Sequence, residues 1–281
     1  MCGFTVIFSY APDAPPVNVG EVRQINERMR ARGPDGEGEW FSPDGRVGLG
    51  HRRLAIIDPS ETGAQPMQLA GSDGAPRFVI TYNGEIYNYK AIRDELTAEG
   101  RLFASNSDTE VLLHLYDRDG PEMVHKLRGM FAFAIWDAEK QGVFLARDPF
   151  GIKPLYYSTD GKTCRVASQV KALLAGGRID TSPDPAGHVG FFMFGYVPEP
   201  HTLYKGVQTL PSGSSLWIDR RGVLETRKYF DVSSHLVARS TEVSGSDVLK
   251  KLHTALSESV GHHLVSDVPV GVFLSAGLDS A

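Results

Sequence analysis

The sequence predicts a protein of mixed α and β structure in two parts, a long N-terminal domain and the start of a second domain. Over roughly the first two thirds of its 281 residues, apolar segments of β type alternate with segments of helical spacing. Near the end, a helical stripe leads into a continuous apolar run, 268–274, which is typical of a strand buried in a parallel sheet. We therefore expect a domain at 2–219, a linker at 220–245 and, at 246–281, the truncated start of an α/β domain.

The first elements follow from periodicity and from turn residues. Residues 2–10 are apolar and rich in β formers, and the Pro-rich stretch that follows ends this strand. A helix comes next, because Val22, Ile25 and Met29 recur at helical spacing before Gly33 and Pro34 stop it.

A later helix, 108–118, has well-marked ends. Ser107 and Glu110 have the spacing of a capping box, and Gly120 with Pro121 ends the helix. The same criteria place another helix at 88–99. Further strands are expected at 47–58, 77–83, 130–137, 142–148, 154–158, 165–168 and 214–219.

Composition and charge exclude several classes of protein. A formal net charge of −5 without a Lys/Arg run argues against a nucleic acid or an anionic membrane as partner. The longest strongly apolar stretch, 189–197, is far below the ~20 residues that a membrane span needs. Neither a basic leader nor a small-residue cleavage site marks a secretory signal. Two cysteines make no disulfide framework, so we expect a cytoplasmic protein.

Cys2 is a candidate nucleophile because of its position. Removal of Met1 would make it the first residue, and its free α-amino group, with an ordinary pKa of about 8, would lie beside the thiol. One residue would then supply both nucleophile and base, which is a known form of covalent catalysis. The alternative is that Cys2 is an ordinary small residue. Cys164 lies in a β-like stretch, so a structural role is expected for it.

Six further motifs, taken with Cys2, resemble one known family. They are Arg-Gly-Pro-Asp at 32–35, His-Arg-Arg-Leu-Ala-Ile-Ile-Asp at 51–58, Tyr-Asn-Gly-Glu-Ile-Tyr-Asn at 82–88, Ser-Asp-Thr-Glu at 107–110, Leu-Arg-Gly-Met-Phe-Ala-Phe at 127–133 and Arg-Asp-Pro-Phe-Gly-Ile-Lys-Pro-Leu-Tyr-Tyr at 147–157. In this order they resemble the class II glutamine amidotransferase domain of glutamine-hydrolysing asparagine synthetases. The resemblance implies an α+β fold, the four-layer αββα sandwich of N-terminal-nucleophile hydrolases, followed by the truncated start of an α/β nucleotide-binding domain with a pyrophosphate loop.

The resemblance also implies a role for each matching residue. Cys2 would attack the side-chain amide of L-glutamine, while the Asn83 side chain and the Gly84 N–H would form the oxyanion hole. Arg53 would bind the α-carboxylate through its planar guanidinium group. The remaining glutamine-binding positions are Leu54, Ala55, Ile56, Ile57, and the acidic Glu85 and Asp108, which would bind the α-ammonium group.

Two of these assignments have a simpler explanation when taken alone. Asn83-Gly84 is a good hairpin turn. Asp108 at the start of a helix is favoured by the helix dipole. Both alternatives stay open at the level of sequence.

The family's second domain activates aspartate with ATP, and ammonia from the first site attacks the β-aspartyl-adenylate. Its phosphate loop reads Ser-Gly-Gly-x-Asp-Ser, where backbone N–H groups converge on the phosphates. This chain matches it with Leu274, Ser275, Ala276, Gly277, Asp279 and Ser280, and Ala276 departs from the pattern. The aspartate pocket and the acidic residues for Mg²⁺ are missing, so we expect a vestigial loop. ATP and Mg²⁺ are implied only for a full-length enzyme, while the glutaminase part needs neither cofactor nor metal.

The expected function is glutamine hydrolysis that supplies ammonia, in a full-length protein for ATP-dependent conversion of aspartate to asparagine. One alternative is the amidotransferase domain of a related ATP-dependent enzyme that amidates another carboxylate. Another is a non-catalytic remnant, against which the retention of Cys2, Arg53 and Asn83 argues. The expected partners are L-glutamine, with aspartate and ATP in the full-length protein, and a second copy in a homodimer; no nucleic acid or membrane partner is expected.

Overall fold

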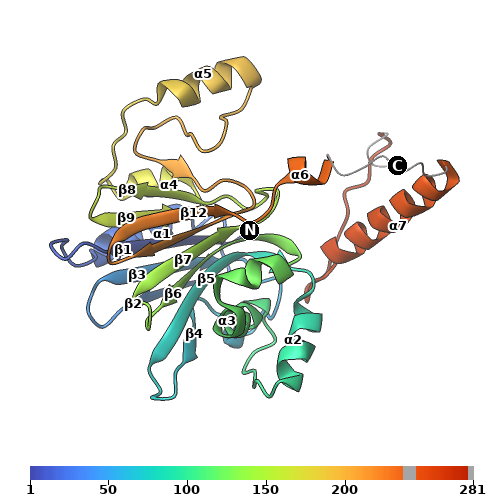
Figure 1. Ribbon diagram of the computed structural model, residues 1–281, viewed down its shortest axis with the longest axis horizontal. Coiled ribbons are helices and arrows are strands. Elements are labelled where there is room, and N and C mark those ends of the chain that lie inside the picture. The colour runs from blue at the N-terminus through green and yellow to red at the C-terminus, as the bar shows by residue number, and fades with distance from the viewer. Residues whose placement is uncertain (237–244, 278–281) are drawn as a thin grey trace.

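The computed structural model describes residues 1–236 and 245–277. Within them, two six-stranded antiparallel sheets lie face to face (Figure 1). The first sheet has the order β10 (Gln208–Thr209), β8 (Tyr156–Thr159), β9 (Thr163–Ala167), β1 (Gly3–Ser9), β3 (Val47–Arg53) and β2 (Gly36–Phe41). The second has the order β12 (Gly222–Lys228), β11 (Ser214–Asp219), β7 (Gly142–Arg147), β6 (Gly129–Asp137), β5 (Pro76–Ile86) and β4 (Met67–Ala70).

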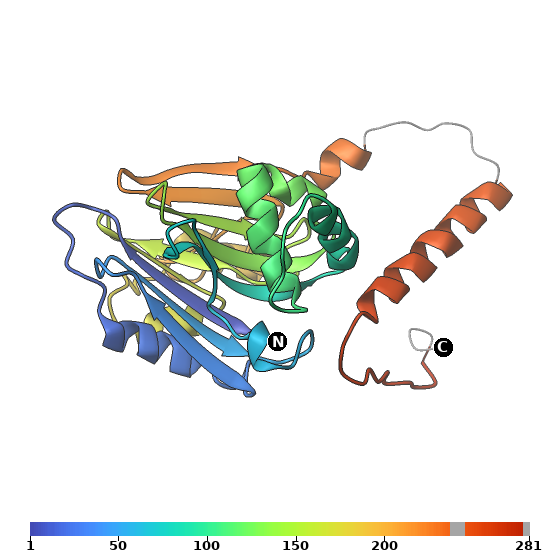
Figure 2. The same ribbon diagram turned by 90° about the horizontal axis from the view of Figure 1, so that it is seen from below.

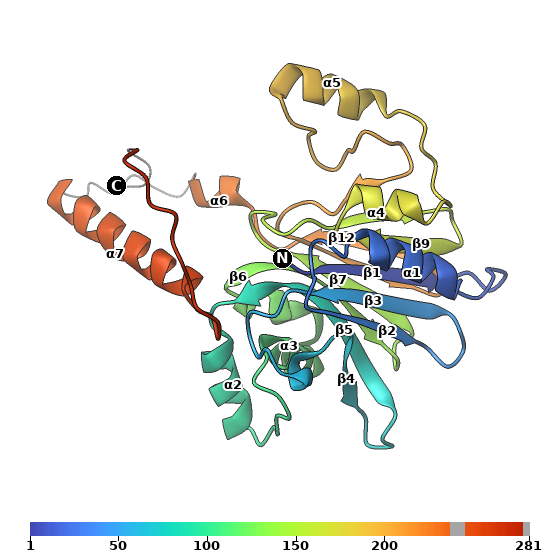
Figure 3. The ribbon, with the colours of Figure 1, turned by 180° about the vertical axis from the view of Figure 1, so that it is seen from behind.

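Helices cover both outer faces of the sandwich. Helices α1 (Val19–Arg28) and α4 (Val170–Ala175) pack on the first sheet, and α2 (Tyr89–Ala98) and α3 (Asp108–Asp119) pack on the second (Figures 1 and 3). Short 3₁₀ turns lie at η1 (Glu61–Gly63) and η2 (Gly120–Lys126). The order of layers is therefore αββα, as the resemblance implied.

Side-chain alternation in the strands explains why two sheets can stack. In β6, the bulky Phe131, Phe133 and Ile135 contact the helix layer, whereas the small Ala132 and Ala134 face the other sheet. Successive residues of a strand point to opposite faces, so small side chains on the inner face let the sheets approach closely. The continuous apolar sequence of β6 is thus the mark of a strand covered on both sides.

Three helices of the described residues lie outside the sandwich. Helix α5 (Pro185–Phe194) projects away from the first sheet, and α6 (Val232–Leu236) follows β12 (Figure 1). Helix α7 (Gly245–His263) lies apart from the sheets, with its C-terminal end nearer to the domain than its N-terminal end (Figure 2). No helix among the described residues is long and apolar enough to cross a membrane.

Three sequence expectations need correction. Residues 268–274 form no strand, because a parallel strand needs neighbours for its backbone groups, and Val272 and Leu274 are exposed. The sheet continues past Asp219, since β12 pairs with β11; the linker expected at 220–245 therefore contains β12 and α6, and residues 237–244 lie outside the described range. The capping box is incomplete, because Glu110 accepts hydrogen bonds from the N–H groups of Ala104 and Ser105.

Candidate active site

Cys2 immediately precedes β1, a strand in the middle of the first sheet. Its carbonyl oxygen accepts a hydrogen bond from Arg32 Nε at 2.9 Å, and its Sγ accepts one from the Leu54 N–H at 3.3 Å. Burial raises the pKa of the Cys2 thiol above its ordinary value. Burial also lowers the pKa of the N-terminal amino group, which belongs to Met1 here. Cys2 is therefore held on both its backbone and its side chain.

The Arg-Gly-Pro-Asp motif holds the end of β3 beside Cys2. Gly33 is needed there, because a Cβ would collide with the peptide that joins Arg52 to Arg53. The Asp35 N–H donates to the carbonyl of Arg53 at 2.9 Å, and its carboxylate accepts from the Ala55 N–H at 2.9 Å. This explains why a motif after the first helix belongs to the site.

The guanidinium group of Arg53 is oriented by the loop that follows it. It donates to the carbonyl oxygens of Ser60 at 2.8 Å and Ile57 at 3.4 Å, and also to that of Asp58. Gly63 lies against it, since a Cβ at that position would overlap the guanidinium group and the Asp58 carbonyl. The loop thus fixes the direction of the one cation expected to bind a carboxylate.

Asn83 and Gly84 lie inside a strand, which rules out the hairpin turn. They pair with Ala132 and Phe131 of β6. The Asn83 side chain is 1% exposed, and its Nδ2 has no hydrogen-bond partner among the residues that the structure describes. Gly84 has to be glycine, because a Cβ would collide with the Met130 carbonyl. A buried amide donor without a partner costs free energy unless a ligand satisfies it.

Asp108 is the first residue of α3, and it also lines the cavity. Its Oδ2 accepts hydrogen bonds from the Tyr82 hydroxyl at 2.9 Å and the Ile86 N–H at 3.1 Å. Burial raises the pKa of Asp108 to about 6, despite the lowering effect of these two donors. Burial raises the pKa of Glu85 as well, and lowers that of Lys153, which is 5% exposed. The cavity lining therefore contains two carboxylates whose charged forms are disfavoured by burial, together with the cations Arg53 and Lys153.

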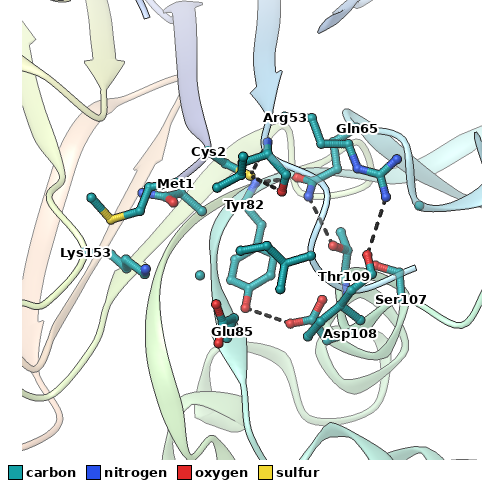
Figure 4. Close-up of a pocket in the computed structure, with 16 residues that line it drawn as sticks. Met1, Cys2, Arg53, Gln65, Tyr82, Glu85, Ser107, Asp108, Thr109 and Lys153 are labelled. Atoms are coloured by element: carbon teal, nitrogen blue, oxygen red, sulfur yellow. Dashed lines mark hydrogen bonds between the residues drawn. The ribbon is translucent and has the colours of Figure 1, made fainter. Parts of the chain in front are cut away.

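One cavity, partly open to solvent, gathers the residues predicted for the glutamine site (Figure 4). Of the residues predicted for the glutamine site, only Ala55 is missing from its lining. The lining consists of Met1, Cys2, Arg53, Leu54, Ile56, Ile57, Gly63, Gln65, Tyr82, Asn83, Gly84, Glu85, Ser107, Asp108, Thr109 and Lys153.

Several lining residues were not singled out from sequence. Tyr82, Ser107, Thr109 and Lys153 stand inside motifs, so their neighbours could have indicated them. Gln65 had no such signal: its side chain accepts from the Tyr82 N–H at 2.7 Å and donates to the Thr109 hydroxyl at 3.2 Å, joining β5 to α3.

The predicted phosphate loop forms no comparable site in its described part. Leu274 is 78% exposed, Ser275, Ala276 and Gly277 are exposed too, and the Gly277 N–H donates to the Ser275 hydroxyl at 3.3 Å. Asp279 and Ser280 lie outside the described residues. The described residues also contain no group of three His, Cys, Asp or Glu side chains placed for a metal ion.

Comparison with known proteins identifies the first domain. Residues 1–230 match the family model of the glutamine amidotransferase domain. The chain belongs to this glutamine amidotransferase family. Residues 251–281 match the start of a second family model, asparagine synthase. The amidotransferase match runs through β12 and ends close to it, in agreement with the pairing of β12 in the sheet.

Curated relatives of this amidotransferase chain are longer proteins. Asparagine synthetase [glutamine-hydrolyzing] 1 of Bacillus subtilis is 40% identical over 282 residues, which is 100% of this chain and 43% of the relative. Asparagine synthetase B of Escherichia coli is 36% identical over 100% of this chain and 44% of its own length. Amidase chry2 of Gibberella zeae is 33% identical over 100% of this chain and 42% of its length. The chain thus spans about two fifths of these relatives.

A solved structure supports the fold of the amidotransferase domain. Glutamine phosphoribosylpyrophosphate amidotransferase of B. subtilis aligns with a TM-score of 0.61 and 20% identity, over 81% of this chain and 49% of that one. At this identity, the alignment shows a shared fold.

Proposed function

We propose that this chain hydrolyses the side-chain amide of L-glutamine, with Cys2 as the nucleophile. The observation that carries the proposal is the unpartnered, buried Nδ2 of Asn83 in the same cavity as the Cys2 thiol. Arg53 lines this cavity together with Glu85 and Asp108, so it offers a cation and two anions to a zwitterion. An amino acid with a side-chain amide fits all of these groups at once.

The chemistry follows from these positions. Cys2 Sγ forms a bond to the amide carbon, its proton passes to the base, and the carbonyl oxygen becomes an oxyanion. The Asn83 Nδ2 and the Gly84 N–H donate to that oxygen, and groups already in place cost no reorganisation. The base then protonates the amide nitrogen, which leaves as ammonia. Water hydrolyses the remaining thioester, releasing glutamate and the free thiol.

The proposed base is the α-amino group of Cys2 after removal of Met1. The same burial that lowers the pKa of the present N-terminal amino group would favour the neutral, proton-accepting form of an amine one residue further in. Intact-mass measurement of the active protein should therefore show a chain that begins at Cys2.

We further propose that, in a longer protein, the ammonia is used by an ATP-dependent synthetase domain that converts aspartate to asparagine. The match of residues 251–281 to the asparagine synthase family and the names of the two synthetase relatives support this. ATP and Mg²⁺ would belong to that domain. An acceptor other than aspartate is the second candidate, because a relative of similar coverage bears the name of an amidase. We place the protein in the cytoplasm, since both cysteines are free.

The decisive test compares the two cysteines. Ammonia and glutamate release from L-glutamine should fall by orders of magnitude in Cys2→Ala, while circular dichroism shows an intact fold. Cys164→Ala is the matched control, because Cys164 is buried in the core and is not part of the cavity lining. Near-normal hydrolysis by Cys2→Ala would show that the nucleophile has been wrongly assigned.

A further inference from the structure

The C-terminal end of α7 and the segment that follows it contact the amidotransferase domain beside the cavity. The Tyr87 ring stacks on His262 with centroids 5.8 Å apart, and Val265 packs against the core between the second sheet and its helices. The Asp267 N–H donates to the Ile56 carbonyl at 3.0 Å, and its carboxylate accepts from the Asp58 N–H at 2.8 Å. Separate contacts thus join a segment of the asparagine synthase match to the loop after β3.

Asp58 is the residue where this segment meets Arg53. Its φ of 47° lies in the left-handed region, which is unfavourable for a non-glycine residue and needs support from neighbours. In this conformation its N–H faces Asp267, while its carbonyl accepts from the guanidinium group of Arg53. Its carboxylate accepts from the Asn106 N–H at 2.9 Å, close to Asp108. Asp58 therefore connects Asp267 both to Arg53 and to the segment just before Asp108, which are proposed to bind the two charged groups of glutamine.

We propose that Asp267 is a positioning residue for glutamine binding, which acts through the backbone of Asp58 on Arg53. The proposal rests on the proposed function and adds to it a residue from outside the amidotransferase match. One charge-assisted hydrogen bond, from the Asp58 N–H to the Asp267 carboxylate, holds Asp58 in its left-handed conformation. In that conformation the Asp58 carbonyl orients the guanidinium group of Arg53. The hydrogen bond also makes the glutamine site responsive to the segment that begins the second domain.

The effect belongs in substrate binding, because neither Asp267 nor Asp58 lines the cavity. Asp267 is itself exposed, so water competes for its hydrogen bond. We expect Asp267→Ala to raise the KM for L-glutamine roughly three- to tenfold, with kcat within about twofold. Asp267→Asn should restore KM to near the wild-type value, because the Asn side-chain oxygen still accepts from the Asp58 N–H. Glu258→Ala, at an exposed carboxylate of α7, is the matched control.

The experiment measures ammonia release by the full chain for each variant over a range of glutamine concentrations. A second measurement follows glutamine affinity by calorimetry in the Cys2→Ala background, where no turnover interferes. In an Arg53→Lys background, Asp267→Ala should raise KM by less than it does alone, since both changes act on the side chain at position 53.

The outcomes separate the two claims. An unchanged KM and affinity in Asp267→Ala, in an enzyme that depends on Cys2, would overturn the positioning role alone. An equal loss in Asp267→Asn, or additive effects with Arg53→Lys, would overturn it as well. Hydrolysis that survives Cys2→Ala would instead contradict the proposed function.

Discussion

Replacing Asp108 with Asn should make this protein more stable and less able to bind glutamine. Both hydrogen bonds to the Asp108 carboxylate, from the Tyr82 hydroxyl and the Ile86 N–H, end on Oδ2. An Asn side chain can place its oxygen there and keep both. The substitution therefore removes a buried charge without removing its supports.

The size of the effect follows from the pKa of Asp108. Burial raises it from 3.8 to about 6. Since each pKa unit corresponds to about 1.4 kcal/mol, ionising Asp108 costs the folded protein about 3 kcal/mol. The folded state binds more protons than the unfolded chain between about pH 4 and 6, so the free energy of unfolding decreases as pH rises through that range. Above it, the full cost is present.

The assay is thermal unfolding of wild type and Asp108→Asn at pH 4 and pH 7. At pH 7 the variant should melt about 6 to 12 °C higher, on the basis of roughly 2–4 °C per kcal/mol for a domain of this size. At pH 4, where Asp108 is largely protonated in the wild type, the difference should nearly vanish. A lower melting temperature for the variant at pH 7, or the same difference at both pH values, would refute this reasoning.

Although Asp108→Asn should raise the melting temperature, it should lower catalytic efficiency. The loss of an anion beside the α-ammonium group should lower kcat/KM for L-glutamine at pH 7 by about tenfold or more. In the wild type, kcat/KM should decrease as pH falls below about 6, because Asp108 becomes neutral. A wild-type profile that stays flat down to pH 5 would show that Asp108 does not bind the substrate in its charged form.

The other predictions address individual parts of the cavity. Asn83→Ala should lower kcat by ~10²–10³, as expected for loss of an oxyanion donor, and unchanged steady-state turnover would contradict its role. Arg53→Lys keeps the charge but loses the planar fork, so kcat/KM should fall about tenfold; a loss confined to kcat would contradict carboxylate binding. Gly63→Ala should raise KM, because its Cβ would overlap the Arg53 guanidinium, whereas Gly261→Ala, with no atom within 4 Å of the added Cβ, should not. Calorimetry with ATP and Mg²⁺ should detect no micromolar binding, because residues 275–277 are exposed; tight one-to-one binding would show a more complete site.

Sequence patterns predict the interior strands of both sheets. The interior strands of both sheets, namely β1, β3, β8 and β9 and then β5, β6, β7 and β11, were all predicted near their observed positions. Buried strands need apolar or alternating side chains, and that requirement is visible without a structure. The motifs likewise contain most of the residues that line the cavity.

The edges of the sheets were decided by tertiary structure. The strands missed from sequence, β2, β4, β10 and β12, are the four edge strands of the two described sheets. An edge strand buries less surface and tolerates charge, as Glu37 and Glu39 in β2 show, so its apolar pattern is weak. The converse error was 268–274, whose apolar pattern is strong but whose neighbouring strands are absent from the described residues.

Only tertiary structure brought the cavity together. Cys2, Asn83 and Asp108 are far apart in sequence, and the stacking of two sheets and a helix sets their separation. Gln65 and Asp267 have no local pattern that indicates a site, because each acts through hydrogen bonds to segments remote from it. Local sequence determines which residues can form strands and helices, but the meeting of side chains from different elements depends on how those elements pack.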